Sequence, residues 1–431
     1  MTDTAIRPYR VEVPQAALDD LADRLRRTNW PGELPGVGGA YGMATDRVRE
    51  LATYWLEKFD WRAVEARLNV HPQFFTGIDG EEVHFLHVRS SRPDATPLVL
   101  THGWPGSVVE YLDVIAPLTE PADPDAPAFH LVIPSLPGFG FSGPTRSAGW
   151  NRYRTARAWA TLMARLGYDR YGAVGNDAGS MISPELGRLD PDHVLGVHVT
   201  QLFSFPSGDP AEFQGLSAAD QAALGHLQWF VENKFSFNQV QSQQPQTLAF
   251  ALADSPVGLL AWNGQLLDES LDPDFVLANV AIYWFTGTAA SAMRFYWEDA
   301  HATEQPAGPT TVPTAVAMFP GDFQSIRRFA TGTTPTSSAG TPSRPGPSGG
   351  GTSPATTPRT RRPTCWSATS GSSSPAATDR RRVRRRAEAA RRRPVSPRPA
   401  PPGPSAGWRS SPCPPPRRPG PGRGSCRHRA P

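Results

Sequence analysis

Cysteine is scarce in this 431-residue sequence, and its three copies, Cys365, Cys413 and Cys426, all lie near the carboxyl end. The first 330 residues therefore offer neither a disulfide framework nor a thiolate metal site. Apolar runs of about 18 residues are also missing, and the opening stretch MTDTAIRPYRVEVPQ has no apolar h-region. These absences predict a cytoplasmic protein with no membrane span, and we expect no metal or other cofactor.

The last quarter of the chain lacks the residues that build a core. Residues 331–431 contain no Leu, Ile, Phe, Met or Tyr, but they contain 21 Pro, 20 Arg and two acidic residues. Such a segment cannot bury enough apolar surface to offset the entropy of ordering it, so we predict that it is disordered. Residues 1–330 carry 23 basic and 38 acidic side chains, and this acidic part gives no indication of a nucleic-acid surface.

Apolar periodicity predicts how the first part of the chain folds. Helical spacing begins after Pro14, at residues 18–25, and recurs in RVRELATYWLEKF, residues 47–59, so two amphipathic helices are expected to open the chain. FFTGIDGEEVHFLHV alternates about Asp79 and Gly80, which predicts a β-hairpin. We assign residues 1–95 to an N-terminal meander domain.

After residue 95 the sequence pattern changes to apolar runs that end in glycine-rich loops. Helical patterns separate some of these runs. The runs are PLVLTHGWPGS, FHLVIPSLPGFGFS, YGAVGNDAGS and HVLGVHVTQL. This alternation predicts an α/β fold with a mostly parallel sheet covered on both faces, with its chemistry at the carboxyl ends of the strands. We assign residues 96–202 to this core, 203–300 to an inserted helical lid, and 301–330 to a return to the core.

One acidic residue, Asp177, lies between two glycines in Gly175-Asn-Asp-Ala-Gly179, just after an apolar run. A strand, a tight Gly-x-X-x-Gly turn and a helix are typical of a nucleophile elbow. An Asp carboxylate at its centre would attack a saturated carbon that bears a leaving group, such as an epoxide or an alkyl halide, and form an ester. The alternative is that Asp177 is a turn residue or a helix N-cap.

A second motif, HGWPGS at residues 102–107, follows a predicted strand. The backbone amides of Trp104 and of Ala178, the residue after the nucleophile, would form a two-donor oxyanion hole. We interpret His102 as a residue that shapes this loop rather than as a base.

In combination these motifs resemble the microsomal-type epoxide hydrolases of the α/β-hydrolase superfamily, including their N-terminal meander domain. The resemblance runs over roughly residues 5–328. The strings that carry it, besides the elbow, are DWRAVEARLNVHPQF, HGWPGS, PSLPGFGFS, ADSPVGLLAW, YWFTGTAASAMRFYWE and VPTAVAMFPGDF.

The resemblance implies a role for each matching residue. Asp177 matches the nucleophile, Tyr296 the tyrosine that protonates the epoxide oxygen, and Asp322 the acid that orients a catalytic histidine. An alternative for Asp322 is a turn residue beside Gly321. Two positions depart from the family pattern: Phe237 stands where a second lid tyrosine is usual, and Ala178 stands where many relatives have Trp. Phe237 would line the substrate pocket without donating a proton.

The general base is missing. The family supplies a histidine from a Gly-Gly-His-Phe-type loop after the acid, whereas the only histidine beyond His301 here is His428. Our hypothesis is a frame shift near Ala330. Read one nucleotide out of phase, residues 331–342 can encode DRDHPNVVRWNT, Gly349 to Pro354 can encode GGGHFA, and the run from Thr364 can encode DLLVGDLR. The alternative is a genuine basic arm, Arg380 to Arg393, that binds an anionic surface.

The sequence thus predicts an epoxide hydrolase that acts on a small apolar epoxide and water and that is inactive or limited to a single turnover. A haloalkane dehalogenase-like hydrolase and a non-catalytic relic or ligand-binding protein are the alternatives. The oligomeric state stays open.

Overall fold

The structure is a computed structural model that describes residues 4–203, 209–304, 308–319, 326, 329 and 340–341. All of these lie in one compact unit, Met1–Ala368. Asp322 and His428 lie outside the described residues. So does the predicted disordered tail, apart from Gly340–Thr341, which form strand β9.

The N-terminal segment contains β1 (Arg7–Tyr9), α1 (Gln15–Arg26), the 3₁₀ helix η1 (Gly38–Tyr41), α2 (Thr45–Glu57) and α3 (Trp61–Asn69). The helices α1 and α2 confirm the two amphipathic helices that the periodicity predicts, since their apolar residues, such as Leu21 and Leu51, are buried. Sequence periodicity missed β1 because three residues, RPY, carry no alternation.

The predicted hairpin is present as β2 (Gln73–Ile78) and β3 (Glu81–Val88), which pair antiparallel. Asp79 and Gly80 form the two-residue turn with φ of 48° and 87°. Positive φ at both turn residues is what a tight hairpin with right-handed twist requires.

The core sheet continues with β4 (Thr96–Thr101), β5 (Phe129–Pro134), β6 (Tyr171–Gly175), β7 (Val194–Val199) and β8 (Thr314–Ala317). The strand order is β1-β2-β3-β5-β4-β6-β7-β8-β9, and every pair from β5 onward is parallel. Between the strands lie η2 (Val108–Tyr111), α4 (Leu112–Thr119), η3 (Gly140–Ser142), α5 (Arg152–Arg165) and α6 (Ala178–Leu189). This is the α/β-hydrolase fold, and its strands β4 and β6 end side by side.

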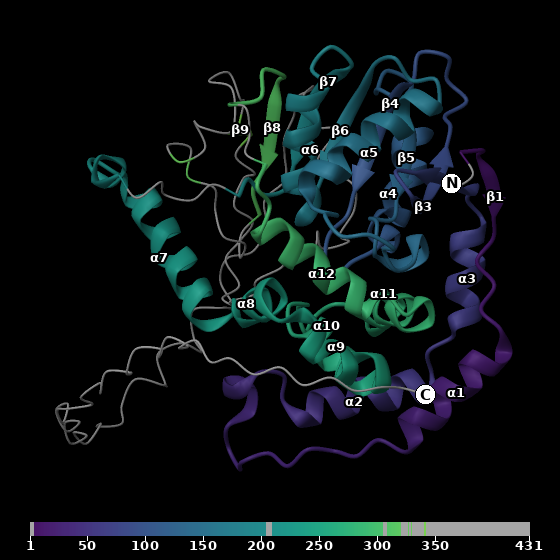
Figure 1. Ribbon diagram of the computed structural model, residues 1–431, viewed down its shortest axis with the longest axis vertical. Helices are drawn as coiled ribbons and strands as arrows, with labels where there is room; N and C mark the ends of the chain where they lie inside the picture. The colour runs from purple at the N-terminus through teal and green to yellow at the C-terminus, as the bar shows by residue number, and fades with distance from the viewer. Residues whose placement is uncertain are drawn as a thin grey trace, which may run out of the picture. The chain divides into compact units, whose positions relative to one another are not determined.

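An inserted group of helices separates β7 from β8. It consists of η4 (Pro210–Phe213), α7 (Ala218–Asn233), α8 (Ser236–Gln243), α9 (Pro245–Asp254), α10 (Pro256–Gly264), α11 (Pro273–Thr286) and α12 (Ala289–Ala300). Figure 1 shows α1 and α2 beneath these helices, where both contact α10. Arg24 donates to the carbonyl oxygen of Asp254 at 2.8 Å and fastens α1 to the end of α9.

Within the described ranges, no single helix is both long and apolar enough to cross a bilayer. The consecutive helices α11 and α12 meet that criterion only as a pair, and they are bent by 93° at the break between them.

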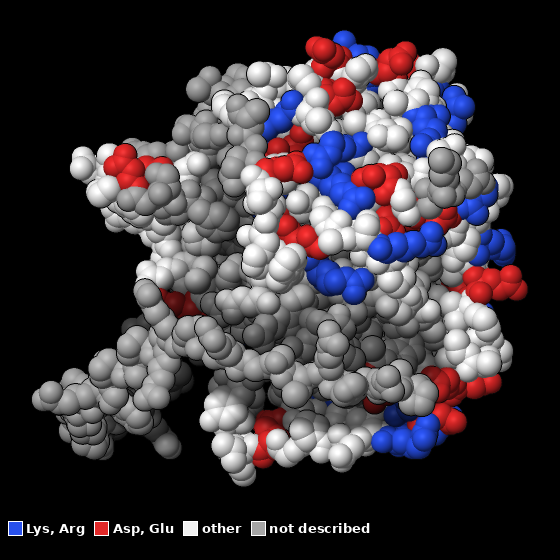
Figure 2. All heavy atoms as spheres, viewed as in Figure 1, with Lys and Arg blue, Asp and Glu red and all other residues white. Residues whose placement is uncertain are grey.

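Charged side chains of both signs alternate over the core face shown in Figure 2. Some charged side chains of the protein pair, as Arg154 does with Asp79 at 2.6 Å. This pairing ties α5 to the turn between β2 and β3.

Candidate active site

Asp177 lies at the sharp turn between β6 and α6, with a φ of 49°. The chain can turn this tightly because Gly175 and Gly179 have no side chains: a Cβ on Gly175 would lie 2.0 Å from the Gly179 carbonyl oxygen. Asp177 occupies the N-cap position of α6, but its side chain makes no capping hydrogen bond. The N-cap alternative therefore does not account for this carboxyl group, which is held out from a strained turn.

The two predicted oxyanion-hole donors both reach the Asp177 carboxyl group. The Trp104 N–H donates to Oδ1 at 3.0 Å, and the backbone N–H of Ala178 also donates to the carboxyl group. Gly103 makes this approach possible, since a Cβ there would lie 2.1 Å from Asp177 Oδ1. Burial raises the pKa of Asp177 to about 6, against the two backbone donors that lower it, so the carboxyl group is mostly ionised at neutral pH.

His102 is buried beneath this loop, and both of its ring nitrogens are engaged. Nδ1 lies 3.0 Å from the Gly103 carbonyl oxygen, and Nε2 accepts from the Leu136 N–H at 3.2 Å. Burial lowers the pKa of His102 to about 4, so the ring is neutral. His102 shapes the loop, as expected, and has no ring nitrogen left to take a proton from water.

The structure brings Tyr296 and Phe237 together against Trp104. The Phe237 ring stacks on the Trp104 ring at 5.4 Å, and Tyr296 meets both rings edge to face at 6.1 Å. Burial and the nearby charge of Asp177 raise the pKa of Tyr296 well above its usual value, which keeps the phenol protonated. An aromatic wall from α8 and α12 thus faces the loop that holds the carboxyl group.

An ion pair fastens α12, which carries Tyr296, to the start of α5. Arg152 Nε donates to Asp299 Oδ1 at 2.8 Å, and the Arg152 backbone N–H donates to the same oxygen at 3.1 Å. Asp299 lies three residues after Tyr296, so this contact fixes the part of the helix that holds the phenol.

Helix α11 anchors the loop that carries Trp104. The Tyr283 hydroxyl donates to the Gly106 carbonyl oxygen at 2.8 Å, and Ser107 Oγ donates to Asn279 Oδ1 at 2.7 Å. Sequence reasoning missed both anchors because they join positions more than 170 residues apart.

Glu110 and the side chain of Asn176 were also missed. The Asn176 side-chain nitrogen lies 2.7 Å from Glu110 Oε2, directly beside the nucleophile. The available signal was an acidic residue in the otherwise apolar run VVEYL, three residues after the HGWPGS motif.

One predicted site residue, the acid Asp322, lies outside the described residues. In the parts of the chain that the structure does describe, no group of three or more His, Cys, Asp or Glu side chains could hold a metal ion.

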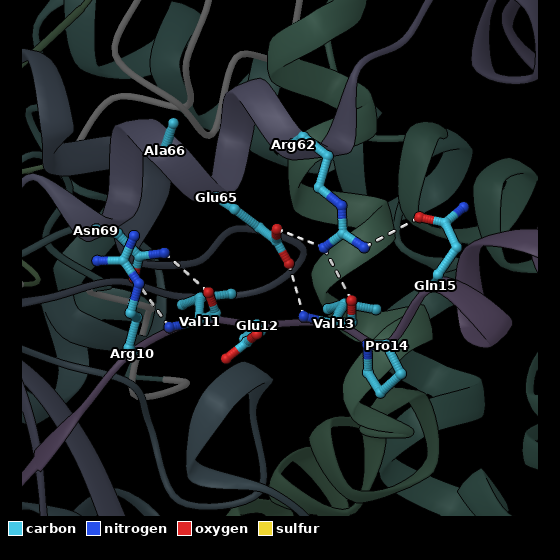
Figure 3. Close-up of a pocket in the computed structure, with 10 residues that line it drawn as sticks. All are labelled: Arg10, Val11, Glu12, Val13, Pro14, Gln15, Arg62, Glu65, Ala66 and Asn69. Carbon is cyan, nitrogen blue, oxygen red and sulfur yellow. Dashed lines mark hydrogen bonds and ion pairs between the residues drawn. The ribbon is translucent and has the colours of Figure 1, made fainter.

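A cavity of about 390 Å³ lies elsewhere, between the N-terminal segment and α3 (Figure 3). Side chains of α3 line it and pair with the extended backbone: Asn69 Oδ1 accepts from the Val11 N–H at 2.9 Å, and Glu65 Oε1 accepts from the Val13 N–H at 2.6 Å. None of the predicted site residues lines this cavity, which marks where the N-terminal segment is fastened to α3.

Comparison with known proteins identifies the class. The family model described as the epoxide hydrolase N terminus matches residues 6–111, and the model described as the alpha/beta hydrolase fold matches residues 96–300. Epoxide hydrolase 1 of Sus scrofa is 32% identical over 359 residues, which cover 74% of this chain and 79% of that protein.

Two solved structures agree with this class. The Aspergillus niger epoxide hydrolase is 32% identical, with a TM-score of 0.69. The match covers 77% of this chain and 89% of that chain. The juvenile hormone epoxide hydrolase of Bombyx mori is 25% identical, with a TM-score of 0.73. The match covers 79% of this chain and 89% of that chain. The chain has the α/β-hydrolase fold. It belongs to the epoxide hydrolase family, and it is a hydrolase of that family.

Proposed function

We propose that this chain opens a small apolar epoxide by nucleophilic attack of Asp177, which forms a covalent hydroxyalkyl ester. The observation that carries the proposal is the pair of backbone donors, Trp104 and Ala178, on the Asp177 carboxyl group. Oδ1, which accepts from Trp104, becomes the ester carbonyl oxygen, and the other carboxylate oxygen bonds to the epoxide carbon. The Trp104 N–H then stabilises negative charge on Oδ1 when water attacks the ester.

Ring opening breaks a carbon–oxygen bond and leaves an alkoxide unless a proton arrives with it. Tyr296 donates this proton, so that attack and protonation come from opposite sides of the ring. Its raised pKa keeps the proton in place until the epoxide oxygen develops charge. Phe237 contributes only an apolar surface, and Tyr296 therefore works alone.

The apolar character of the substrate follows from the rings around the carboxyl group. Trp104 contacts Phe237, Tyr296 and, at 6.5 Å between ring centroids, Trp262. Such a wall favours an epoxide with an aromatic or aliphatic substituent. Membership of the epoxide hydrolase family favours an epoxide over the alkyl halide of a dehalogenase.

Release of the diol needs a base that activates water, and we propose that this chain lacks one. Asp322 would orient a histidine, but His428 does not stand at the family's spacing after it. A single-nucleotide frame shift near Ala330 accounts for both the missing histidine and the lack of core-forming apolar residues in residues 331–431. Sequencing the genomic DNA across the Ala330 codon tests this, because an in-frame reading on both sides of that codon would rule the frame shift out.

The alkylation step is tested with styrene oxide and intact-mass spectrometry of the full chain. We expect one adduct on the wild-type chain and none at this position in D177N, whose amide is not a nucleophile. Peptide mapping assigns the adduct. An equal adduct on both chains would refute Asp177 as the nucleophile.

A further inference from the structure

The Glu110 carboxyl group bridges the loop that holds Trp104 and the elbow that holds Asp177. Glu110 lies in η2, and its side chain folds back over Gly106, where a Cβ would lie 1.7 Å from Glu110 Oε1. The other oxygen, Oε2, is 2.7 Å from the side-chain nitrogen of Asn176. One carboxyl group therefore contacts both segments that the proposed nucleophile depends on.

As long as Glu110 is ionised, the Tyr111 hydroxyl lies close to two acceptor oxygens, of which the Thr101 carbonyl oxygen also accepts from the Asn176 backbone N–H at 3.2 Å. The Tyr111 hydroxyl lies 2.5 Å from Asn176 Oδ1 and 2.8 Å from the Thr101 carbonyl oxygen. It has a single proton for these two acceptors, because both oxygens can only accept.

A half-turn of the Asn176 amide removes this conflict. The amide nitrogen would then donate to the Tyr111 oxygen, and the Tyr111 hydroxyl would donate to the Thr101 carbonyl. The amide oxygen would face Glu110 Oε2, which requires a proton on Glu110. Each of these side-chain groups then has a partner with the correct role, and the Thr101 carbonyl oxygen accepts from both the Tyr111 hydroxyl and the Asn176 backbone N–H. Such complementarity is the criterion by which amides are oriented.

We propose that Glu110 is a positioning residue for Asp177: its protonated carboxyl group donates to the Asn176 amide and so holds the elbow against the loop that carries Trp104. The proposal rests on the proposed function, since it concerns the same nucleophile. Asn176 transmits the effect because it is the residue next to Asp177 in the turn.

The electrostatics of the site agree with a neutral Glu110. Burial raises the pKa of Glu110 to about 8 even when the Asn176 amide nitrogen, whose hydrogen bond lowers the pKa, faces it, and the negative charge of Asp177 also raises it. Turning the amide removes the hydrogen bond that lowers this pKa. The other titratable groups that interact with Glu110 are Tyr111 on η2 and Tyr283 on α11, whose own pKa values burial and the Glu110 charge raise well above the usual value. Below about pH 8, Asp177 is therefore the single negative charge in this group.

Ionisation of Glu110 above about pH 8 has a predictable consequence. It removes the donor to the Asn176 amide and places a second negative charge near the nucleophile. A misplaced nucleophile attacks more slowly, by up to about 100-fold for a displacement of about 1 Å. Tyr296 cannot cause this alkaline loss of rate, because its pKa lies well above 10.

The test is the pH dependence of Asp177 alkylation by styrene oxide, followed by mass spectrometry on full-length chains. The wild-type rate should fall above about pH 8. E110Q keeps a donor for the Asn176 amide but cannot ionise, so its rate should stay constant over the same range. E120Q is the matched control. Glu120 accepts hydrogen bonds from the backbone N–H and the hydroxyl of the exposed Ser91, and its replacement should leave the alkaline fall in rate in place.

The outcomes separate the two proposals. A wild-type rate that does not fall above about pH 8, or a fall that persists in E110Q, overturns the role of Glu110. Absence of any Asp177 adduct at every pH instead overturns the proposed function. Thermal unfolding of each variant confirms that the chains compared are folded.

Discussion

The residues proposed to form the ester and those needed to hydrolyse it belong to two different regions of the chain. Asp177, Trp104 and Tyr296 lie within the described residues, and hydrogen bonds or ring contacts hold each of them. Asp322 follows β8 outside the described residues, and the printed sequence has no histidine at the family's spacing after it. We call the first region the alkylation region and the second the hydrolysis region.

In the proposed mechanism the two steps of covalent catalysis depend on separate stretches of sequence. The residues proposed for alkylation all lie before residue 300, whereas the proposed hydrolysis step needs residues after β8. A change near Ala330 can therefore remove the second step and leave the first in place. An enzyme of this kind would be consumed by its own substrate.

The largest effect within the alkylation region is expected from the proton donor. Y296F should slow adduct formation by about 100-fold or more, because general acids typically contribute that much. The rate is measured by intact mass over time with styrene oxide. Y168F is the control, since the Tyr168 hydroxyl bonds His87 away from the site. A Y296F rate within about twofold of wild type would remove Tyr296 from the alkylation region.

A smaller effect is expected from the contact that fastens α12. D299A leaves Arg152 without its partner at a site where the Asp299 side chain is only 9% exposed, which should cost about 3 kcal/mol of unfolding free energy. It should also slow alkylation, since α12 carries Tyr296.

The matched control for D299A is E304A. The Arg157–Glu304 pair joins α5 to the segment that follows α12, but its side chains are 48% and 45% exposed, so its loss should cost less than about 1 kcal/mol. Urea unfolding compares the two variants. Equal losses would show that the Arg152–Asp299 contact does not hold the helix.

The smallest effect is expected on stability, because the ionised carboxylate of Asp177 lowers the free energy of unfolding. The pKa of Asp177 rises from 3.8 to about 6 on folding, so its ionised form is disfavoured in the folded state at pH 7. D177N should therefore raise the unfolding free energy by about 2 kcal/mol, allowing for partial exposure. The gain should shrink as the pH falls through about 6 and vanish below about 4, where both states are protonated. A gain that does not depend on pH would contradict this origin.

Sequence patterns predicted the elements whose spacing repeats. The apolar periodicity of α1 and α2, the Asp79–Gly80 turn and the Gly-flanked Asp177 each carry a local signal that burial or backbone geometry enforces. The contact of Trp104 with Asp177 could be expected as well, because parallel strands β4 and β6 end at one edge of the sheet.

The rest could not be predicted because it depends on contacts between distant segments. The Tyr283 hydroxyl on the Gly106 carbonyl, the Arg152–Asp299 pair and the Glu110–Asn176 bridge join residues 66 to 177 positions apart. No periodicity encodes such pairs. Glu110 in particular looks like a solvated residue of a short helix until the elbow is placed beside it.

The central claim is that this chain is alkylated on Asp177 and that the resulting ester is not hydrolysed. The most direct test incubates the full-length protein with excess styrene oxide and follows adduct and diol together. We predict that one adduct per chain accumulates on the Asp177 peptide while diol does not exceed the amount of enzyme. Sustained diol release, or accumulation of no adduct on that peptide, would contradict the account.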